Sequence, residues 1–349
     1  MEMGKSISLA LVTFTFVGCL GIWVGGCQTP EQKVEKLISK LQNKNPKNRQ
    51  SAEAALTKMG TVVVPALIQA LQNPKIRQRV VGVLAKIGED ASDAVPALLK
   101  TLQYPDVNWH VVEALAKVGR NTVPDLVQAL QNPKIRQHVV GVLAKIGEDA
   151  SDAVPALVQL LPDEDANVRA SAAKALGAIG KDAADAVPGL VQLLPDEDAN
   201  VRVNAAEALA EIGIDAVPAL VQLLPDEDAN VRASAVWTLA KIGTTAVPAL
   251  IQTLQSKNAQ TRISAAGILG QIETLDAAPA LIQALQDPDS RVRREAALAL
   301  GHITAVDAVS ALIQLLQDGN EYVRFNVVSA LKQIGTAEAL KAAEEYELR

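Results

Sequence analysis

DAVPALVQLLPDEDANVR, residues 152–169, returns twice further along the chain and thereby reveals how the chain is organised. It recurs at 185–202 with one change, Gly189, and again without change at 215–232. Its proline belongs to a place that can be followed through the whole chain. That place holds Glu35, Pro65, Pro96, Pro124, Pro155, Pro188, Pro218, Pro248, Pro279 and Ser310. About ten units therefore follow one another, and repetition at this period is typical of stacked helical repeats.

Each unit carries the signals of two helices joined by an acidic turn. We expect Asp152 to cap a short first helix whose opening turn holds Pro155, because a missing N–H costs nothing there. Apolar residues spaced three and four apart predict a second helix over about 166–179. Its buried face should hold Val168, Ala172, Ala175, Leu176 and Ile179. Gly180 should end this helix in a left-handed conformation.

One such hairpin cannot bury its own apolar face, so neighbouring units must stack. The predicted fold is all-α, an α-solenoid of about ten two-helix repeats that occupies residues 27–349. A stack needs polar caps at its two ends. The Lys- and Gln-rich residues 31–50 and the charged tail 337–349 suit that role.

A second duplication overlays the first. Residues 70–98 match residues 129–157, and the one difference is that Arg79 becomes His138. Because identical copies indicate recent duplication, their identity says nothing about functional constraint.

The composition narrows the possible functions. Hydrophobic residues make up 49% of the 349 residues and aromatic residues only 3%, which favours closely packed helices built from Ala, Val, Leu and Ile. The net charge is −6, which argues against nucleic acid as a partner, because phosphate binding needs a strongly basic surface. Both cysteines, Cys19 and Cys27, precede the repeats, so the repeats have no thiol for a disulfide, a zinc site or a nucleophile.

The N-terminal segment, residues 1–26, is mostly apolar and is predicted to be a signal peptide or a membrane anchor. It runs into Val24-Gly25-Gly26-Cys27, which resembles the bacterial lipobox, where a small residue precedes a cysteine that is acylated and becomes the mature N-terminus. Cys27 is the expected lipid attachment site, and Cys19 is a competing one. An uncleaved single-pass membrane helix and simple secretion are the alternatives. All of them place the body outside the cytoplasm, and a lipid would hold it at the membrane on the periplasmic side.

The second helix and the turn before it resemble a known repeat. An Asp followed by Val-Arg, and then an alanine-rich run ending in ALxxIG, is similar to HEAT repeats, especially the HEAT-like repeats of phycobilisome lyases. The stretch 163–180, DEDANVRASAAKALGAIG, matches this pattern throughout. The resemblance covers about residues 31–336 and implies a curved superhelix whose second helices line the concave side. It indicates a fold more than a function, since such repeats serve scaffolds, adaptors and a few enzymes.

Two groups of enzymes share the resemblance. HEAT-like deoxyhypusine hydroxylases hold iron with adjacent His-Glu pairs, but His110, His138 and His302 are followed here by Val, Val and Ile. No phosphate-binding glycine loop or serine-nucleophile motif is found either, so we expect no catalytic residue, no metal site and no cofactor. The alternative is a phycobilisome-lyase-like or chaperone-like protein that acts on a chromophore protein. Those lyases are cytoplasmic, which conflicts with the N-terminal segment.

An arginine recurs early in the second helix of nearly every unit. The set comprises Arg49, Arg77, Arg136, Arg169, Arg202, Arg232, Arg262, Arg293 and Arg324, with Asn108 as the one departure. An arginine near the positive end of a helix needs a carboxylate or carbonyl partner close by. Loop carboxylates can serve, namely Asp163, Asp165, Asp287, Asp289 and Asp318. We interpret the row as a structural ladder, and an anion-binding ladder is the alternative.

The positions that vary between units should mark the binding face. The first and fifth residues after the repeat arginine lie one turn apart, opposite the buried residues. In four consecutive units these positions include Trp237, Ile263, Leu298 and Phe325, with Arg294 beside them. Exposed apolar rows mark binding sites, and Trp and Arg are frequent in hot spots. These five residues, and Trp109 as an isolated feature nearer the other end, are the predicted partner-binding residues. The alternative is that they pack into gaps between neighbouring helices.

Together these features predict a membrane-tethered, non-enzymatic α-solenoid that binds a protein or a peptide on its concave face. A purely structural spacer is a further alternative.

Overall fold

The computed structural model describes residues 29–106 and 108–348, and this part of the chain is helical without a β-strand. Ten helical pairs follow one another, as predicted, and α21 (Ala337–Glu347) closes the stack. The first helices are α1 (Pro30–Lys40), α3 (Val64–Ala70), α5 (Val95–Thr101), α7 (Val123–Ala129), α9 (Val154–Val158), α11 (Val187–Gln192), α13 (Val217–Gln222), α15 (Val247–Thr253), α17 (Ala278–Ala284) and α19 (Val309–Leu315). The second helices are α2 (Pro46–Lys58), α4 (Arg77–Ile87), α6 (Asn108–Val118), α8 (Arg136–Ile146), α10 (Ala166–Ile179), α12 (Ala199–Ile212), α14 (Ala229–Ile242), α16 (Ala259–Ile272), α18 (Ser290–His302) and α20 (Glu321–Ile334).

Short 3-10 helices lead into nine of the first helices, and they correct the expectation for Asp152. They are η1 (Gly60–Val63), η2 (Gly88–Ala94), η3 (Gly119–Thr122), η4 (Gly147–Ala153), η5 (Gly180–Ala186), η6 (Gly213–Ala216), η7 (Gly243–Ala246), η8 (Leu275–Ala277) and η9 (Val306–Ala308). Asp152 lies inside η4, and α9 begins at Val154 without a side-chain cap. Because η4 runs directly into α9, the Ser151 carbonyl accepts the Val154 N–H, and a side-chain cap is not needed.

Helix α10 has the predicted bounds and the predicted core. Asp165 caps it by accepting a hydrogen bond of 2.9 Å from the Asn167 N–H, which places a carboxylate at the positive end of the helix. The residues expected inside are all buried, namely Val168, Ala172, Ala175, Leu176 and Ile179. The second-helix pattern is therefore confirmed.

Gly180 ends α10 with a positive φ, but not in the left-handed helical conformation that we expected. Its φ is 72° and its ψ is −135°, a combination that is open essentially to glycine alone. The reason is that the chain turns at once into η5 instead of making an isolated helix end. Gly335, which follows α20, does adopt the left-handed conformation, with φ 72° and ψ 11°.

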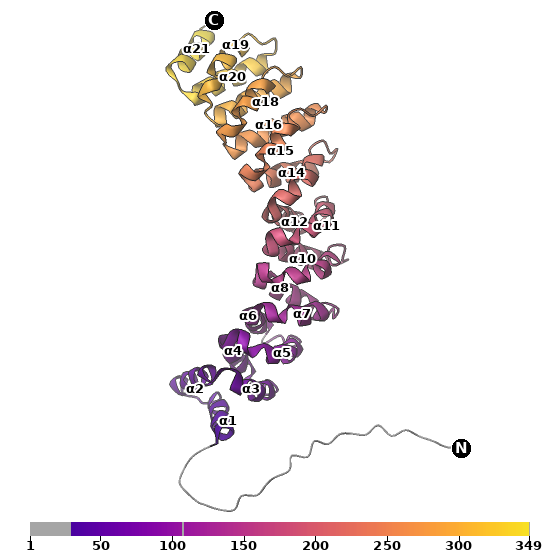
Figure 1. Ribbon diagram of the computed structural model, residues 1–349, viewed down its shortest axis with the longest axis vertical. Coiled ribbons are helices and arrows are strands. Elements are labelled where there is room, and N and C mark those ends of the chain that lie inside the picture. Colours follow the sequence, from indigo (N-terminus) through magenta and orange to yellow (C-terminus); the bar gives the residue numbers. More distant parts are fainter. Residues whose placement is uncertain (1–28, 107, 349) are drawn as a thin grey trace, which may run out of the picture.

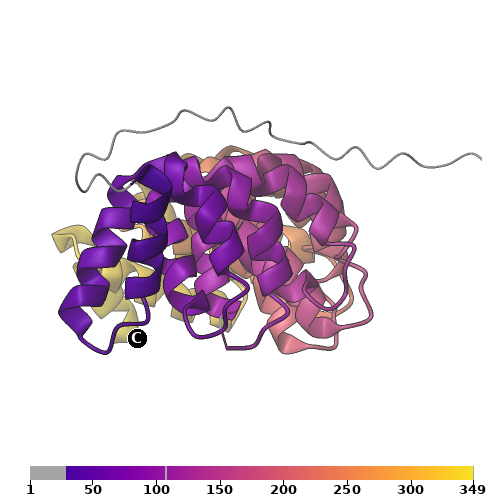
Figure 2. The same cartoon turned by 90° about the horizontal axis from the view of Figure 1, so that it is seen from below.

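The pairs stack into a curved superhelix (Figure 1). From α2 to α12 the second helices lie on the inner side of the curve, and first helices such as α3, α5, α7 and α11 lie on the outer side. Seen from below, the helices of successive pairs run side by side (Figure 2). Over this range the second helices therefore line the concave side, as the resemblance to HEAT repeats implied.

Both ends of the stack carry polar caps. At the start, Thr29 and Gln32 form a capping box on α1. At the end, α21 packs on α20 through Ala339 and Ala343, which are buried, and the remainder of its surface is largely polar.

Candidate protein-binding face

Several of the repeat arginines tie their unit to the next. Arg169 donates from Nε and Nη2 to both carboxylate oxygens of Asp196, at 2.8 and 2.9 Å. Its Nη1 donates to the backbone carbonyls of Asp163 and Glu164 in its own loop. Bidentate pairs of the same kind join Arg262 to Asp287 and Arg293 to Asp318, and Arg136 donates to Asp163. We call each of these Arg–Asp contacts a rung of the ladder. At these rungs the structural interpretation is confirmed, because carboxylate oxygens of the protein itself accept the hydrogen bonds of the guanidinium groups.

Asn108, the departure from the arginine row, has a matched partner. In the orientation that satisfies both ends of its amide, Asn108 donates to the carbonyls of Leu102 and Tyr104 and accepts from His138 Nε2 at 2.9 Å. The unit that lacks the arginine is thus followed by the copy in which Arg79 has become His138. Two repeat arginines contact tyrosines instead of carboxylates: Arg77, in the unit before Asn108, lies 3.9 Å over the ring of Tyr104, and Arg324, in the last unit, donates from Nε to Tyr346 Oη at 2.8 Å.

The Arg–Asp contacts of the ladder predict how the free energy of unfolding depends on pH. Hydrogen bonds from Arg169 and Arg293 hold the pKa of Asp196 and of Asp318 below the ordinary value. A carboxylate with a lowered folded-state pKa stabilises the fold above its unfolded pKa of about 3.9, and this stabilisation is lost as the pH falls through the folded-state value. We expect the free energy of unfolding, measured with denaturant and circular dichroism, to change little from pH 7 to about 5 and to fall below about pH 4. Asp196→Asn should make that fall shallower, and an equal fall in both proteins would contradict the assignment.

The structure divides the predicted partner-binding residues into two groups. Trp109, Trp237 and Phe325 are exposed, at 67%, 46% and 73% of their surface. The other three, Ile263, Arg294 and Leu298, are partly buried. The predicted face is therefore accessible, but it is an interrupted row of aromatic rings rather than a continuous apolar strip.

Trp237 lies beside charged residues of its own and the preceding unit. Lys241 Nζ is 5.4 Å from the centre of the Trp237 ring and 3.2 Å from Glu211 Oε1 on α12. The ammonium thus bridges a carboxylate and an aromatic face. Trp109 has an aromatic neighbour instead, with its ring centroid 4.3 Å from that of His110.

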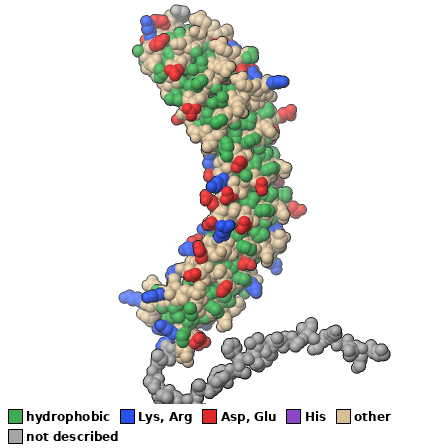
Figure 3. Space-filling view, in the orientation of Figure 1, with side chains coloured by type: hydrophobic (Ala, Val, Ile, Leu, Met, Phe, Trp, Pro, Cys, Tyr) green, Lys and Arg blue, Asp and Glu red, His purple; other side chains and the backbone are tan. Residues whose placement is uncertain are grey.

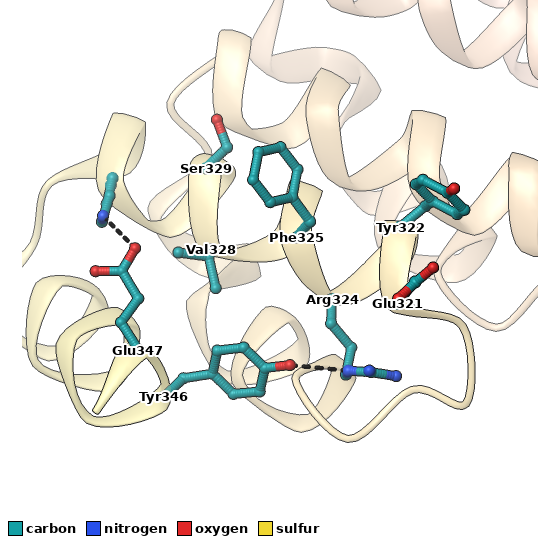
Figure 4. Close-up of a pocket in the computed structure, with 9 residues that line it drawn as sticks. Glu321, Tyr322, Arg324, Phe325, Val328, Ser329, Tyr346 and Glu347 are labelled. Atoms are coloured by element: carbon teal, nitrogen blue, oxygen red, sulfur yellow. Dashed lines mark hydrogen bonds and ion pairs between the residues drawn. The ribbon is translucent and has the colours of Figure 1, made fainter. Parts of the chain in front are cut away.

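Phe325 borders an open pocket of about 780 Å³ at the C-terminal end of the stack (Figure 4). Val328 and Tyr346 contribute apolar surface between α20 and α21, and the Lys332–Glu347 ion pair of 2.6 Å holds the two helices together. Tyr322, one turn before Phe325, is 63% exposed and also lines the pocket. Sequence reasoning missed Tyr322 and Tyr346 because it considered only positions that follow the repeat arginine.

Charged side chains gather on the inner side at the middle of the stack (Figure 3). Ion pairs cross from one second helix to the next, such as Lys145 with Glu113 at 3.2 Å and Lys241 with Glu211 at 3.2 Å. In the sequence, each pair is a Lys and a Glu separated by about one repeat. Such pairs cannot be found when each unit is considered separately. This charged region separates Trp109 from the aromatic C-terminal part.

Arg294 has an acidic neighbour on the same face. Glu295 is partly buried, and this burial raises the pKa of its carboxyl group. A Cβ on Gly267 in the preceding unit would lie 3.0 Å from Glu295 Oε1, so the carboxylate fills the space left by the missing side chain. A carboxyl group therefore lies next in sequence to Arg294.

The histidines contact polar side chains of neighbouring units. His110 Nε2 lies 2.7 Å from Gln78 Nε2, and His138 pairs with Asn108. Over residues 29–106 and 108–348, no three His, Cys, Asp or Glu side chains come close enough to hold a metal ion.

The predicted anchor, residues 1–26 with the candidate lipid sites Cys27 and Cys19, lies outside the described residues. Within the described part, the helical run Ala229–Thr253 is long and apolar enough to cross a membrane. That run comprises α14, η7 and α15, which pack on their neighbours as repeat helices, so it is weak support for a span.

The repeat family is shown by sequence. The family model of HEAT repeats matches overlapping stretches along almost the whole described chain: 34–116, 64–131, 123–194, 187–257, 247–318 and 278–346. The chain therefore belongs to the HEAT-repeat family. Among curated proteins, no sequence matches it.

Solved structures share the repeat architecture with this chain. An engineered protein is 25% identical over 87% of this chain and 99% of its own, with a TM-score of 0.38. A chain from the complex in which Kap95p binding switches the loops of RanGDP is 14% identical over 90% and 52%, with a TM-score of 0.47. A chain from the CpcE–CpcF complex of phycocyanin lyase from Nostoc sp. PCC7120 is 25% identical over 65% and 94%, with a TM-score of 0.32. Because all three TM-scores lie below 0.5, the family assignment rests on the repeat match.

Proposed function

We propose that this protein is a membrane-tethered, non-enzymatic scaffold that binds a protein or a peptide along its concave face. The observation that carries the proposal is the exposure of Trp237 and Phe325 on second helices of a HEAT-repeat solenoid. HEAT repeats suggest a protein-binding scaffold in general. The two aromatic residues indicate which part of this solenoid makes the contact.

Exposed aromatic rings on helices are costly to leave in water and effective in an interface. A tryptophan or phenylalanine side chain buries 150–250 Å² when it is covered, and few residues in an interface carry most of the binding free energy. Trp237 and Phe325 are fixed on separate second helices, α14 and α20, so little conformational entropy is lost when a partner covers them. A partner that contacts both rings would span the C-terminal part of the concave face.

Tethering is the second part of the proposal. It is supported by the apolar residues 1–26 and by the lipobox-like sequence that ends in Cys27. A lipid on Cys27 would hold the solenoid at the membrane with its body outside the cytoplasm, on the periplasmic side. The partner would then be a protein of that compartment or the exposed part of a membrane protein.

The aromatic face is tested by site-directed photo-crosslinking in cells. A photo-reactive phenylalanine analogue at position 237 or 325 should crosslink to the same protein, and the analogue at the exposed Leu275 should not. Trp237→Ala with Phe325→Ala should weaken the complex by at least about 30-fold, since truncating a hot-spot residue costs about 2 kcal/mol or more. Leu275→Ala is the matched control.

The melting temperature decides between an interface and a core. An unchanged melting temperature together with lost binding supports the proposal. A large drop in the melting temperature of the double variant, or equal crosslinking from position 275, would show that these rings do not form the partner site.

A further inference from the structure

One sequence occurs in two different packing environments. Residues 152–172 and 215–235 are identical over their whole length, from DAVPALVQLL through PDEDANVRASA. Any difference in how they pack must therefore come from their neighbours. The two segments end inside α10 and α14, and these two helices differ in burial. Ile179 at the end of α10 is fully buried, whereas the equivalent Ile242 at the end of α14 is only partly buried.

The first difference is the tie to the following unit. Arg169 reaches both oxygens of Asp196, but Ser256 stands in the equivalent place after Arg232. Ser256 Oγ accepts the Asn258 N–H at 3.2 Å, as Asp196 Oδ1 accepts the Asp198 N–H at 2.9 Å. Ser256 therefore makes the same hydrogen bond within its loop as Asp196 does, but it has no carboxylate that could accept hydrogen bonds from Arg232. Among the described residues, Arg232 donates to the carbonyls of Asp226 and Glu227 in its own loop.

The junction between α12 and α14 also lacks an Arg–Asp rung, although both the arginine and the carboxylate are present. Asp226 occupies the place of Asp196, yet Arg202 donates to the carbonyls of Asp196 and Glu197. No ion pair joins Arg202 to Asp226 within the described residues. The residue types needed for the rung are there, so the two helices themselves must stand too far apart for it.

Side-chain size at one recurring contact accounts for the spacing. At three of the four tied junctions a glycine eight residues after the arginine faces an alanine in the next helix: a Cβ would lie 3.0 Å from Ala208 Cα at Gly177, 2.9 Å from Ala299 Cα at Gly270 and 2.8 Å from Ala330 Cα at Gly301. The fourth, between α8 and α10, has two small residues in these places, Ala144 and Ala175. The equivalent pairs at the two junctions of α14 are Ala210 with Thr238 and Ala240 with Ile268. Thr238 and Ile268 are fully buried, so their bulk lies inside the stack. The distance between packed helices depends on the side chains at the contact, and larger ones hold the axes further apart.

From these observations we propose that α14 is a joint between two stiffer arms of the solenoid. The arms are α8–α12 and α16–α20, in which Arg–Asp rungs connect consecutive units. The direction of the stack changes around α12 and α14 (Figure 1). The Lys241–Glu211 ion pair joins α12 and α14, but its side chains are 38% and 59% exposed. An exposed ion pair of this kind adds little rigidity. Because Trp237 lies on α14 and Phe325 lies on α20, in the arm α16–α20, bending at α14 would change the distance between the two rings.

Hydrogen exchange of the full-length protein tests the joint with an internal standard. The amides of 166–172 and 229–235 belong to the same sequence, ANVRASA, so their intrinsic exchange rates are equal and only the structure can make them differ. Peptides that extend into the unlike residues that follow can be told apart by mass. We expect the amides of 229–235 to exchange at least about 10-fold faster than those of 166–172. Equal protection of the two segments would overturn the proposal.

Two loop substitutions then test the cause. Ser256→Asp supplies a carboxylate to Arg232 but leaves the bulk of Ile268 in place, so, like Asp226 at the preceding junction, it should form no rung and leave the exchange of 229–235 unchanged. Asp196→Ser removes a rung and should speed exchange of 166–172. Both changes lie in loops at the surface, so the fold should persist in each variant. If Asp196→Ser leaves the exchange of 166–172 unchanged, the ladder does not set the stiffness of the junctions and the joint has no basis. If Ser256→Asp slows the exchange of 229–235, side-chain bulk does not keep the helices apart.

Discussion

Leu176→Ala is expected to lower the free energy of unfolding by about 2–5 kcal/mol, because the side chain is fully buried and its loss leaves a cavity. Leu176 lies in the last turn of α10, where Gly177 makes the close contact with Ala208 of the next helix. Tightly packed helices relax little into a cavity, so the cost should lie in the upper part of this range. Denaturant unfolding followed by circular dichroism measures it.

Lys174→Ala is the matched control for this prediction. Lys174 lies two residues earlier on the same helix, but its side chain is exposed. Its replacement should change the free energy of unfolding by less than about 0.5 kcal/mol. A loss of less than about 1 kcal/mol for Leu176→Ala would contradict the burial of that side chain in the stack.

The helices that sequence predicts best are the ones whose signals are local. For α10 the capping aspartate, the three-and-four spacing and the final glycine all lie within the helix or at its ends, and the observed bounds match the predicted ones. The ten units follow from repetition of the same signals. These features needed no knowledge of neighbouring units.

Predictions that treated a helix end as isolated were less accurate. Asp152 is not a cap, and Gly180 is not left-handed helical, because the 3-10 helices η4 and η5 connect the helices without a break. Local rules for capping apply to a helix that begins or ends in a loop. Nothing in the residues themselves shows that a 3-10 turn takes the place of that loop.

The candidate face shows what depends on contacts between units. Trp237 and Leu298 both lie five residues after a repeat arginine, and Phe325 and Ile263 both lie one residue after it. Yet Trp237 and Phe325 are exposed, whereas Leu298 and Ile263 are partly buried. Exposure at these positions depends on how closely the next helix approaches, and that distance is set by residues about 30 positions away. The partner of each repeat arginine lies at the same remove, as with Arg169 and Asp196. A single unit therefore predicts which face is accessible, but not which of its residues stay uncovered.

Cys27→Ser is expected to abolish fatty-acid labelling of the protein and to block its maturation. Each buried CH₂ group contributes about 0.8 kcal/mol to membrane binding, and a single acyl chain gives only reversible attachment. A diacylated and N-acylated cysteine exceeds that threshold, whereas serine at this position carries no lipid. Metabolic labelling with a fatty-acid analogue measures the first effect, and the mass of the chain measures the second. Cys19→Ser should leave both unchanged.

The mass of the mature chain separates the remaining alternatives for residues 1–26. A lipidated protein should begin at Cys27, and its Cys27→Ser variant should fail to mature. An uncleaved anchor would instead keep residues 1–26 in both proteins and hold both in the membrane, because about 20 apolar residues suffice to span it. Simple secretion would release both proteins in soluble form. Normal labelling and maturation of Cys27→Ser would therefore move the anchor to Cys19 or to a membrane helix, while the proposed partner face on α14 and α20 would be unaffected, since it does not depend on how the N-terminus is held.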